Sequence, residues 1–168
     1  MKMVVSGAAA VAVIALAGCS PREEAATETA ATPKRAAETA PAAETAVWTD
    51  DIDAAFKTAA EKKKPVFIDF TGSDWCGWCK LAEKNIFSTK AWADFSAKVV
   101  CLKVDFPREG RPEAAVLKSR EDLARKFNVE GFPTLVLADA GRGEIARFVA
   151  GRKDAAEFIA EVEKALKK

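Results

Sequence analysis

The chain has 168 residues, of which 49% are hydrophobic, and its 26 Lys and Arg residues against 25 Asp and Glu residues give a formal net charge of +1. This balance argues against nucleic acid as the main partner, because a phosphate-binding domain usually has a clear basic excess. The complete absence of histidine excludes Cys-His and Ser-His dyads and any His-ligated zinc or haem site. The candidate reactive residues are therefore the four cysteines, Cys19, Cys76, Cys79 and Cys101.

The N-terminal residues have the pattern of an export signal. Lys2 precedes the uncharged stretch 3–17, which is too short for a typical membrane span and has the length of a signal-peptide core. The stretch ends in the sequence LAGC at 16–19, which resembles the lipobox of bacterial lipoproteins. That resemblance implies cleavage after Gly18 and anchoring through two or three acyl chains on Cys19. The alternative is an ordinary signal peptide that leaves Cys19 as an unpaired thiol.

The residues after Cys19 predict a location and a linker. Ser20 resembles the sorting residue of lipoproteins passed on to the outer membrane, so we expect a periplasm-facing envelope protein, with the outer membrane favoured over the inner. The following residues, mainly Ala, Thr, Glu and Pro, cannot bury enough surface to offset their ordering entropy. We expect a signal peptide over 1–18, a lipidated cysteine with a flexible linker over 19–46, and a folded domain over 47–168.

The first half of that domain predicts a helix, a buried strand and two further helical segments. Apolar residues recur at helical spacing over 52–60, after two aspartates that suit a helix N-terminus, and a lysine run then ends the helix. The stretch 65–71 is nearly continuous in apolar character, as a buried strand is, apart from Asp69. Helical patterns follow over 76–87 and 90–97.

The second half predicts a strand, a loop, a helix, a hairpin and a closing helix. In chain order, these are 99–104, 106–118, a helix through Phe127, the strands 134–138 and 144–150, and 155–166. The helix through Phe127 is predicted to begin at Ser119, where Asp122 three residues on completes a capping box. A Gly-containing turn joins the two strands into the hairpin. With the two consecutive helical segments taken together, the order is αβαβαββα.

A Cys-x-x-Cys motif lies between the first strand and the helix after it. The sequence WCGWCK at 75–80 places the sulfur of Cys76 over the unpaired N–H groups of a helix start, which favours the thiolate. Cys79 lies one turn further on the same face, close enough for a disulfide that opens and closes. The predicted chemistry is thiol-disulfide exchange, in which Cys76 attacks a substrate disulfide and Cys79 resolves the mixed disulfide. It needs no cofactor and no metal.

Three other interpretations of the motif stay open. A structural zinc site would need two more ligands than this motif supplies. A purely structural disulfide is possible in an oxidising compartment, although such bridges usually close longer loops. A copper site would have no histidine ligand, and the two methionines that could serve as soft ligands, Met1 and Met3, both lie in the predicted signal peptide.

From residue 47 to residue 168 the sequence resembles the thioredoxin family. The strand VFIDF at 66–70 leads to the Cys-x-x-Cys motif, and VEGFPT at 129–134 resembles the family's cis-proline loop. The segment FTGSD at 70–74 is most similar to exported relatives of the C-terminal domain of DsbD. The resemblance implies an α/β thioredoxin fold, a central mixed sheet flanked by helices, with an additional N-terminal helix.

The resemblance also implies roles for single residues. Cys76 is the nucleophile, Cys79 the resolving thiol, and Asp69 a buried carboxylate of raised pKa that takes the proton from Cys79 through water. Asp69 lies seven residues before Cys76, one more than in the family, so a longer turn over 71–74 is expected to absorb the difference. The alternative for Asp69 is a strand-end acid that reaches solvent. Lys103 matches the lysine that pairs with the carboxylate.

A substrate-binding rim is implied around the cysteines. Pro133 resembles the cis-proline that faces the disulfide, which would let the backbone of Phe132 pair with an extended substrate segment. Trp75, Trp78 and Phe132 would form an apolar rim, although Trp78 and Phe132 could instead be packing residues. Gly77 and Trp78 stand where thioredoxin usually has Gly-Pro, and they tune the redox potential.

Together these features predict a lipid-anchored, monomeric thiol-disulfide oxidoreductase that reduces disulfides of exported proteins. Reduction in an oxidising compartment needs an electron donor, so a DsbD-like membrane thiol relay is an implied partner. The alternatives are a disulfide oxidase or isomerase, and a non-catalytic binding module whose cysteines stay paired. Cys101 is predicted to be a buried structural thiol rather than a third redox partner.

Overall fold

A mixed five-stranded sheet forms the centre of the molecule in the computed structural model, which describes residues 45–167. The strand order is β1-β3-β2-β4-β5. The strands are β1 (Trp48–Thr49), β2 (Val66–Thr71), β3 (Val100–Asp105), β4 (Thr134–Ala138) and β5 (Glu144–Phe148). The first three run parallel to one another, whereas β4 is antiparallel to β2 and β5 is antiparallel to β4. The predicted signal peptide, Cys19 and most of the predicted linker lie outside the described residues.

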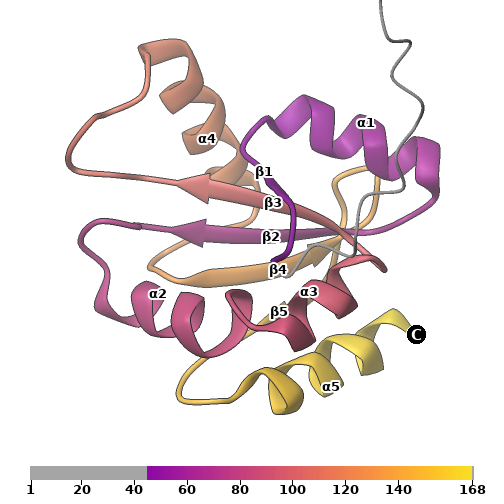
Figure 1. Ribbon diagram of the computed structural model, residues 1–168. Helices are drawn as coiled ribbons and strands as arrows, with labels where there is room; N and C mark the ends of the chain where they lie inside the picture. Colours follow the sequence, from indigo (N-terminus) through magenta and orange to yellow (C-terminus); the bar gives the residue numbers. More distant parts are fainter. Residues whose placement is uncertain (1–44, 168) are drawn as a thin grey trace, which may run out of the picture. The chain divides into compact units, whose positions relative to one another are not determined.

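Helices cover both faces of the sheet (Figure 1). They are α1 (Ile52–Lys62), α2 (Gly77–Ala82), the π-helix η1 (Glu83–Phe87), α3 (Lys90–Ser96), α4 (Ala114–Lys126) and α5 (Ala155–Leu166). Helices α1 and α4 lie on one face, and α2, α3 and α5 lie on the other (Figure 1). This is the helix-flanked mixed sheet that the sequence predicts, including the additional N-terminal helix.

Alternation along β2 divides the core into two parts. Phe67 faces the α3 and α5 side, where it contacts the rings of Trp92 and Phe158. Ile68 and Phe70 face the α1 and α4 side. Successive side chains of a strand point to opposite faces, so a strand buried on both sides is apolar almost throughout, as β2 is.

Local capping sets the ends of several helices. Asp51 is the N-cap of α1 and accepts the N–H of Ala54 at 2.9 Å, which confirms the predicted acidic start. Lys63 ends α1 in the left-handed conformation, within the lysine run that predicted the end. Asp154 caps α5 in the same way as Asp51 caps α1.

The predicted start of the helix through Phe127 is wrong. Helix α4 begins at Ala114, so the proposed capping residues Ser119 and Asp122 lie inside it. Asp122 pairs with Lys118 one turn earlier instead of capping. The N-cap residue Glu113 makes no side-chain capping bond, so no polar signal marks the true start.

Two smaller features also differ from the prediction. Strand β1 was not predicted, because two residues are too few for an alternating pattern; it pairs with β3. The helix predicted over 76–87 divides into α2 and η1. The other helices and strands begin and end within two residues of the predicted ranges.

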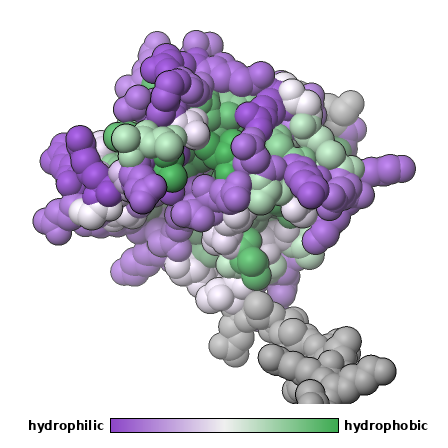
Figure 2. Space-filling view, turned by 90° about the horizontal axis from the view of Figure 1, so that it is seen from above, coloured by the Kyte–Doolittle hydropathy of each residue, from purple (hydrophilic) through white to green (hydrophobic). Residues whose placement is uncertain are grey.

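The face covered by α1 and α4 is hydrophilic over most of its outline, and hydrophobic residues reach its surface mainly toward the middle (Figure 2). Within residues 45–167, none of the helices is long and apolar enough to span a bilayer.

Candidate active site

Cys76 and Cys79 form a disulfide at the N-terminus of α2, with their Cα atoms 5.2 Å apart. Cys76 is the N-cap residue, and its sulfur accepts the backbone N–H of Cys79 at 3.1 Å. An N–H donor and the positive end of a helix both favour the thiolate at Cys76 once the bond is reduced. In the part of the chain described, no cluster of three or more possible metal-ligating side chains is present.

A tight turn connects β2 to the disulfide and contains the extra residue. The carbonyl of Gly72 accepts the N–H groups of Trp75 at 3.3 Å and Cys76 at 2.8 Å. A Cβ atom on residue 72 would lie 2.4 Å from Cε2 of Trp75, so the indole can cover the turn only because residue 72 is glycine. Strand β2 thus ends at Thr71, and a hydrogen-bonded turn fills the space between it and Cys76.

Two further contacts fix this turn to the end of β3 and to the residue that follows it. Ser73 donates to the carboxylate of Asp105 twice, through its N–H at 2.9 Å and its hydroxyl at 2.6 Å. The indole N–H of Trp75 donates to the carbonyl of Phe106 at 2.8 Å. The backbone in front of Cys76 is thus held by a segment some thirty residues later in the chain.

Asp69 lies buried in β2, with 3% of its surface exposed, so the alternative of a strand-end acid reaching solvent is wrong. One carboxylate oxygen, Oδ1, is buried and has no hydrogen-bond partner in the structure. Burial raises the pKa of Asp69 from 3.8 to about 7, against the opposing effect of Lys103. A carboxylate with such a pKa can take up and release a proton near neutral pH, which the role implied for Asp69 requires.

Lys103 does not hydrogen bond to Asp69, although the two are register partners on β3 and β2. Its ammonium instead donates to Oε2 of Glu83 at 2.8 Å and lies 5.2 Å from the centroid of the Trp48 ring. Glu83, which the sequence interpretation missed, raises the pKa of Asp69, whereas Lys103 lowers it. Its position one helical turn after Cys79 was the available signal.

A hollow of about 450 Å³ opens beside Cys79. Glu83 and Lys103 line it together with polar residues of β2, α2 and the segment after η1. Solvent can therefore approach the resolving cysteine and the charged pair from this side.

The proline loop lies next to the turn. The Phe132–Pro133 peptide bond is cis, and Thr134, the next residue, is the register partner of Phe70 near the end of β2. The ring of Phe132 packs edge-on against Trp75, with 5.7 Å between centroids. The structure thus brings together the loop and the turn that the sequence singled out separately.

The remaining rim residues are on the surface. Trp78 is 53% exposed and Trp75 is 37% exposed, so neither indole is a core packing residue. Gly77, the first residue of α2, is exposed and has open space where a Cβ would be. Phe132 is partly buried and packs against Trp75.

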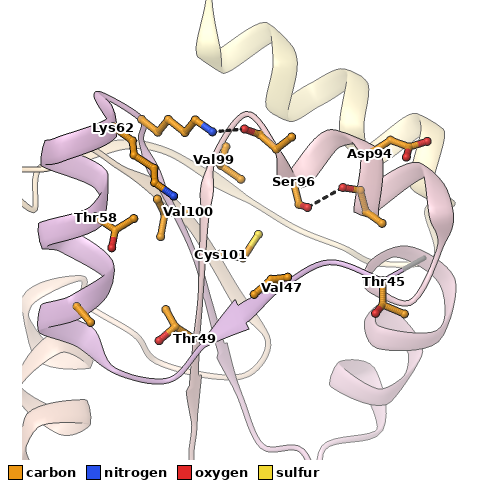
Figure 3. A pocket seen from close by; sticks show the side chains of 14 residues that line it. Thr45, Val47, Thr49, Thr58, Lys62, Asp94, Ser96, Val99, Val100 and Cys101 are labelled. Atoms are coloured by element: carbon orange, nitrogen blue, oxygen red, sulfur yellow. Dashed lines mark hydrogen bonds between the residues drawn. The ribbon is translucent and has the colours of Figure 1, made fainter. Parts of the chain in front are cut away.

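Cys101 lies in β3, where its register partners are Trp48 and Phe67, far along the strand from the end of β2 that leads to the disulfide. It is a buried free thiol, as predicted, and burial raises its pKa to about 12. It borders a hollow of about 620 Å³ between α1 and α3 (Figure 3). A thiol with that pKa stays protonated and unreactive at neutral pH.

Comparison with known proteins places these features in a family. Residues 52–166 match a family model described as a thioredoxin-like domain. The disulfide bond reductase DsbH of Chlamydia pneumoniae is 30% identical over 114 residues, which cover 67% of this chain and 69% of DsbH. The thiol:disulfide interchange protein DsbD of Yersinia pestis is 36% identical over 102 residues, 60% of this chain but only 16% of DsbD.

Solved structures agree with the sequence comparison. A structure of a DsbH oxidoreductase superposes with a TM-score of 0.71 at 28% identity and covers 81% of this chain and 95% of that one. The oxidised C-terminal domain of DsbD from Neisseria meningitidis superposes with a TM-score of 0.52 at 21% identity, over 73% of this chain and 99% of that one. The architecture is therefore the thioredoxin fold.

Proposed function

The chain belongs to the thioredoxin-like family, and from this premise we propose that it reduces disulfide bonds of exported proteins. The observation that carries the proposal is the disulfide between Cys76 and Cys79 at the N-terminus of α2. Relatives of this chain are named disulfide bond reductase and thiol:disulfide interchange protein, so the enzyme class is thiol-disulfide oxidoreductase.

The reaction runs in two exchange steps from the reduced protein. The thiolate of Cys76 attacks one sulfur of the substrate disulfide, which releases the other substrate sulfur as a thiolate and leaves a mixed disulfide. Asp69 takes the proton of Cys79 through water, and the Cys79 thiolate attacks Cys76. The Cys76–Cys79 disulfide forms and the second substrate thiolate leaves. The substrate gains two electrons, and the protein is left oxidised.

A reductase of this kind needs a donor that returns two electrons to the disulfide. The similarity to DsbD supports a membrane thiol relay as that donor, and it supports reduction over oxidation as the direction. The chain matches less than a fifth of the length of the DsbD relatives.

We place the domain in the bacterial envelope, anchored through lipid on Cys19 and facing the periplasm, with residues 19–46 as the linker. The LAGC sequence at 16–19 supports this location. Growth with a labelled fatty acid tests it: the chain should take up label, and Cys19→Ala should not. Equal labelling of the two would refute the lipid anchor and leave the redox function untouched.

Trapping of mixed disulfides tests the exchange chemistry. In Cys79→Ser the resolving thiol is missing, so covalent complexes with exported proteins should accumulate on Cys76 and disappear on reduction. Cys76→Ser is the matched control and should accumulate none. If Cys79→Ser binds exported proteins but forms no covalent complex, the chain is a binding module.

The equilibrium reduction potential tests the direction. Titration against glutathione should give a value around or below the roughly −270 mV of thioredoxin. A value near about −120 mV, typical of DsbA, would make the protein an oxidase.

A further inference from the structure

The loop that follows β3 places a cation at the active site. Arg108 is exposed, and its guanidinium carbon lies 4.5 Å from the centroid of the Trp75 ring. Trp75 is the residue directly before Cys76. Among residues 45–167, the guanidinium forms no ion pair with any carboxylate. It is a positive charge on the indole of the residue before the nucleophile, and it has no ion-pair partner among the described residues.

Asp74 fixes the backbone that carries this cation. Its Oδ2 accepts the N–H of Glu109 at 2.8 Å and that of Arg108 at 2.9 Å. These two bonds, that to Glu109 first, lower the pKa of Asp74, so its carboxylate is ionised at neutral pH. The guanidinium lies over the Trp75 ring on an exposed residue, where a cation–π contact holds it without using its N–H donors.

The turn between β2 and Cys76 holds the loop after β3 in place. Ser73 bonds to Asp105 at the end of β3, and Asp74 bonds to the backbone of the loop that follows. The loop after β3 is therefore joined to the active-site turn at several points, and the position of Arg108 is set before any partner arrives.

Resting on the proposed function, we infer that Arg108 is a specificity-determining residue that binds a carboxylate next to the disulfide that Cys76 attacks. A guanidinium offers a planar pair of donors that matches a carboxylate, and a stacked, pre-oriented one loses less freedom on binding. The substrate class is a polypeptide disulfide flanked by Asp or Glu. The neighbouring acid Glu109 offsets the long-range attraction of anions to this loop. A preference for acidic substrates therefore requires direct contact between the substrate carboxylate and Arg108.

Two peptides of equal length test this inference. Each carries one disulfide, flanked by Asp in the first peptide and by Lys in the second, and each reacts with the pre-reduced full chain at low salt. Rate constants come from acid-quenched samples analysed by mass spectrometry. We expect the acidic peptide to react about three to ten times faster than the basic one, the range that charge-assisted contacts at a partly exposed site give.

Variants of Arg108 assign the preference to this residue. Arg108→Gln should bring the ratio of the two rates close to one, and Arg108→Glu should reverse it. Lys118→Gln removes the same charge from α4, where Lys118 is exposed and pairs with Asp122, and should keep the wild-type ratio. The ratio compares two substrates on one protein sample, so a loss of active protein does not change it.

Different results separate this inference from the proposed function. If Arg108→Gln and the wild-type chain have the same ratio of rates, Arg108 does not contribute to substrate specificity and the inference is wrong. If the wild-type chain reduces neither peptide, the proposed function itself fails.

Discussion

Lys103 and Asp69 are register partners on neighbouring strands, yet the ammonium of Lys103 donates to Glu83 at 2.8 Å and leaves the Asp69 oxygen Oδ1 without a hydrogen bond. The buried carboxylate is thus influenced by a cation and an anion that are bound to each other. Burial has the largest effect and raises the pKa of Asp69, Lys103 lowers it, and Glu83 raises it.

We expect the rate of substrate reduction to have a pH inflection near 7 that follows Asp69. Lys103→Met removes the cation that lowers the pKa of Asp69, so the inflection should move to higher pH. Glu83→Gln removes the anion that raises it and releases Lys103, so the inflection should move to lower pH. Rates measured from pH 5 to 9 check both directions, and inflections that move together would contradict the assignment to Asp69.

The same carboxylate makes stability depend on pH. Its pKa is about 7 in the folded protein and 3.8 without the effects of folding, so the folded state holds this proton more tightly between these values. The free energy of unfolding should therefore fall as pH rises from about 4 to about 7, and Asp69→Asn should remove that fall. The difference in the free energy of unfolding between Asp69→Asn and wild type should therefore shift in favour of Asp69→Asn by up to about 4 kcal/mol from pH 4 to pH 8.

Urea denaturation of the disulfide form measures this difference. Asp122→Asn is the matched control, because Asp122 is exposed and its pKa is lowered, first by the hydrogen bond from Lys118. It should show no gain at high pH. A constant difference between wild type and Asp69→Asn at all pH values would mean that Asp69 titrates normally.

Trp78→Ala should weaken the reaction with polypeptides more than the reaction with a small disulfide. The indole precedes Cys79 and is 53% exposed, so it has apolar surface to bury against a partner. Because it is not part of the core, its removal should cost the fold little stability. We expect kcat/KM for a protein disulfide to fall about fivefold, as for a contact worth about 1 kcal/mol, and that for oxidised glutathione to fall less. Equal losses for the two would indicate a changed redox potential instead.

Arg120→Ala should destabilise the fold. The side chain is buried in α4, donates to the carbonyl of Asp105 at 2.7 Å and approaches Asp50 at 3.3 Å. Its loss removes a buried side chain and the charged donor of the partly buried Asp105 carbonyl, so the free energy of unfolding should drop by about 2–4 kcal/mol in urea denaturation. Arg125→Ala, on the exposed side of α4, should change it by less than about 0.5 kcal/mol. Similar losses would contradict a structural role for Arg120.

The sequence alone determined the features that local rules control. The apolar run of β2, the acidic start of α1 and the Cys-x-x-Cys motif at a helix start are each readable from neighbouring residues. The thioredoxin fold and the cis-proline at Pro133 came from the resemblance to a known family, which these local motifs made visible. The start of α4 was not readable, because Glu113 makes no capping bond there.

Tertiary structure decided what depends on residues far apart in the chain. Burial of Asp69 in the folded protein raises its pKa, and its charged neighbours Glu83 and Lys103 come from a helix and another strand. Arg108 meets Trp75 only because the loop after β3 folds back onto the turn before Cys76. Desolvation and electrostatic interaction depend on distance in space, whereas the patterns in a sequence report distance along the chain.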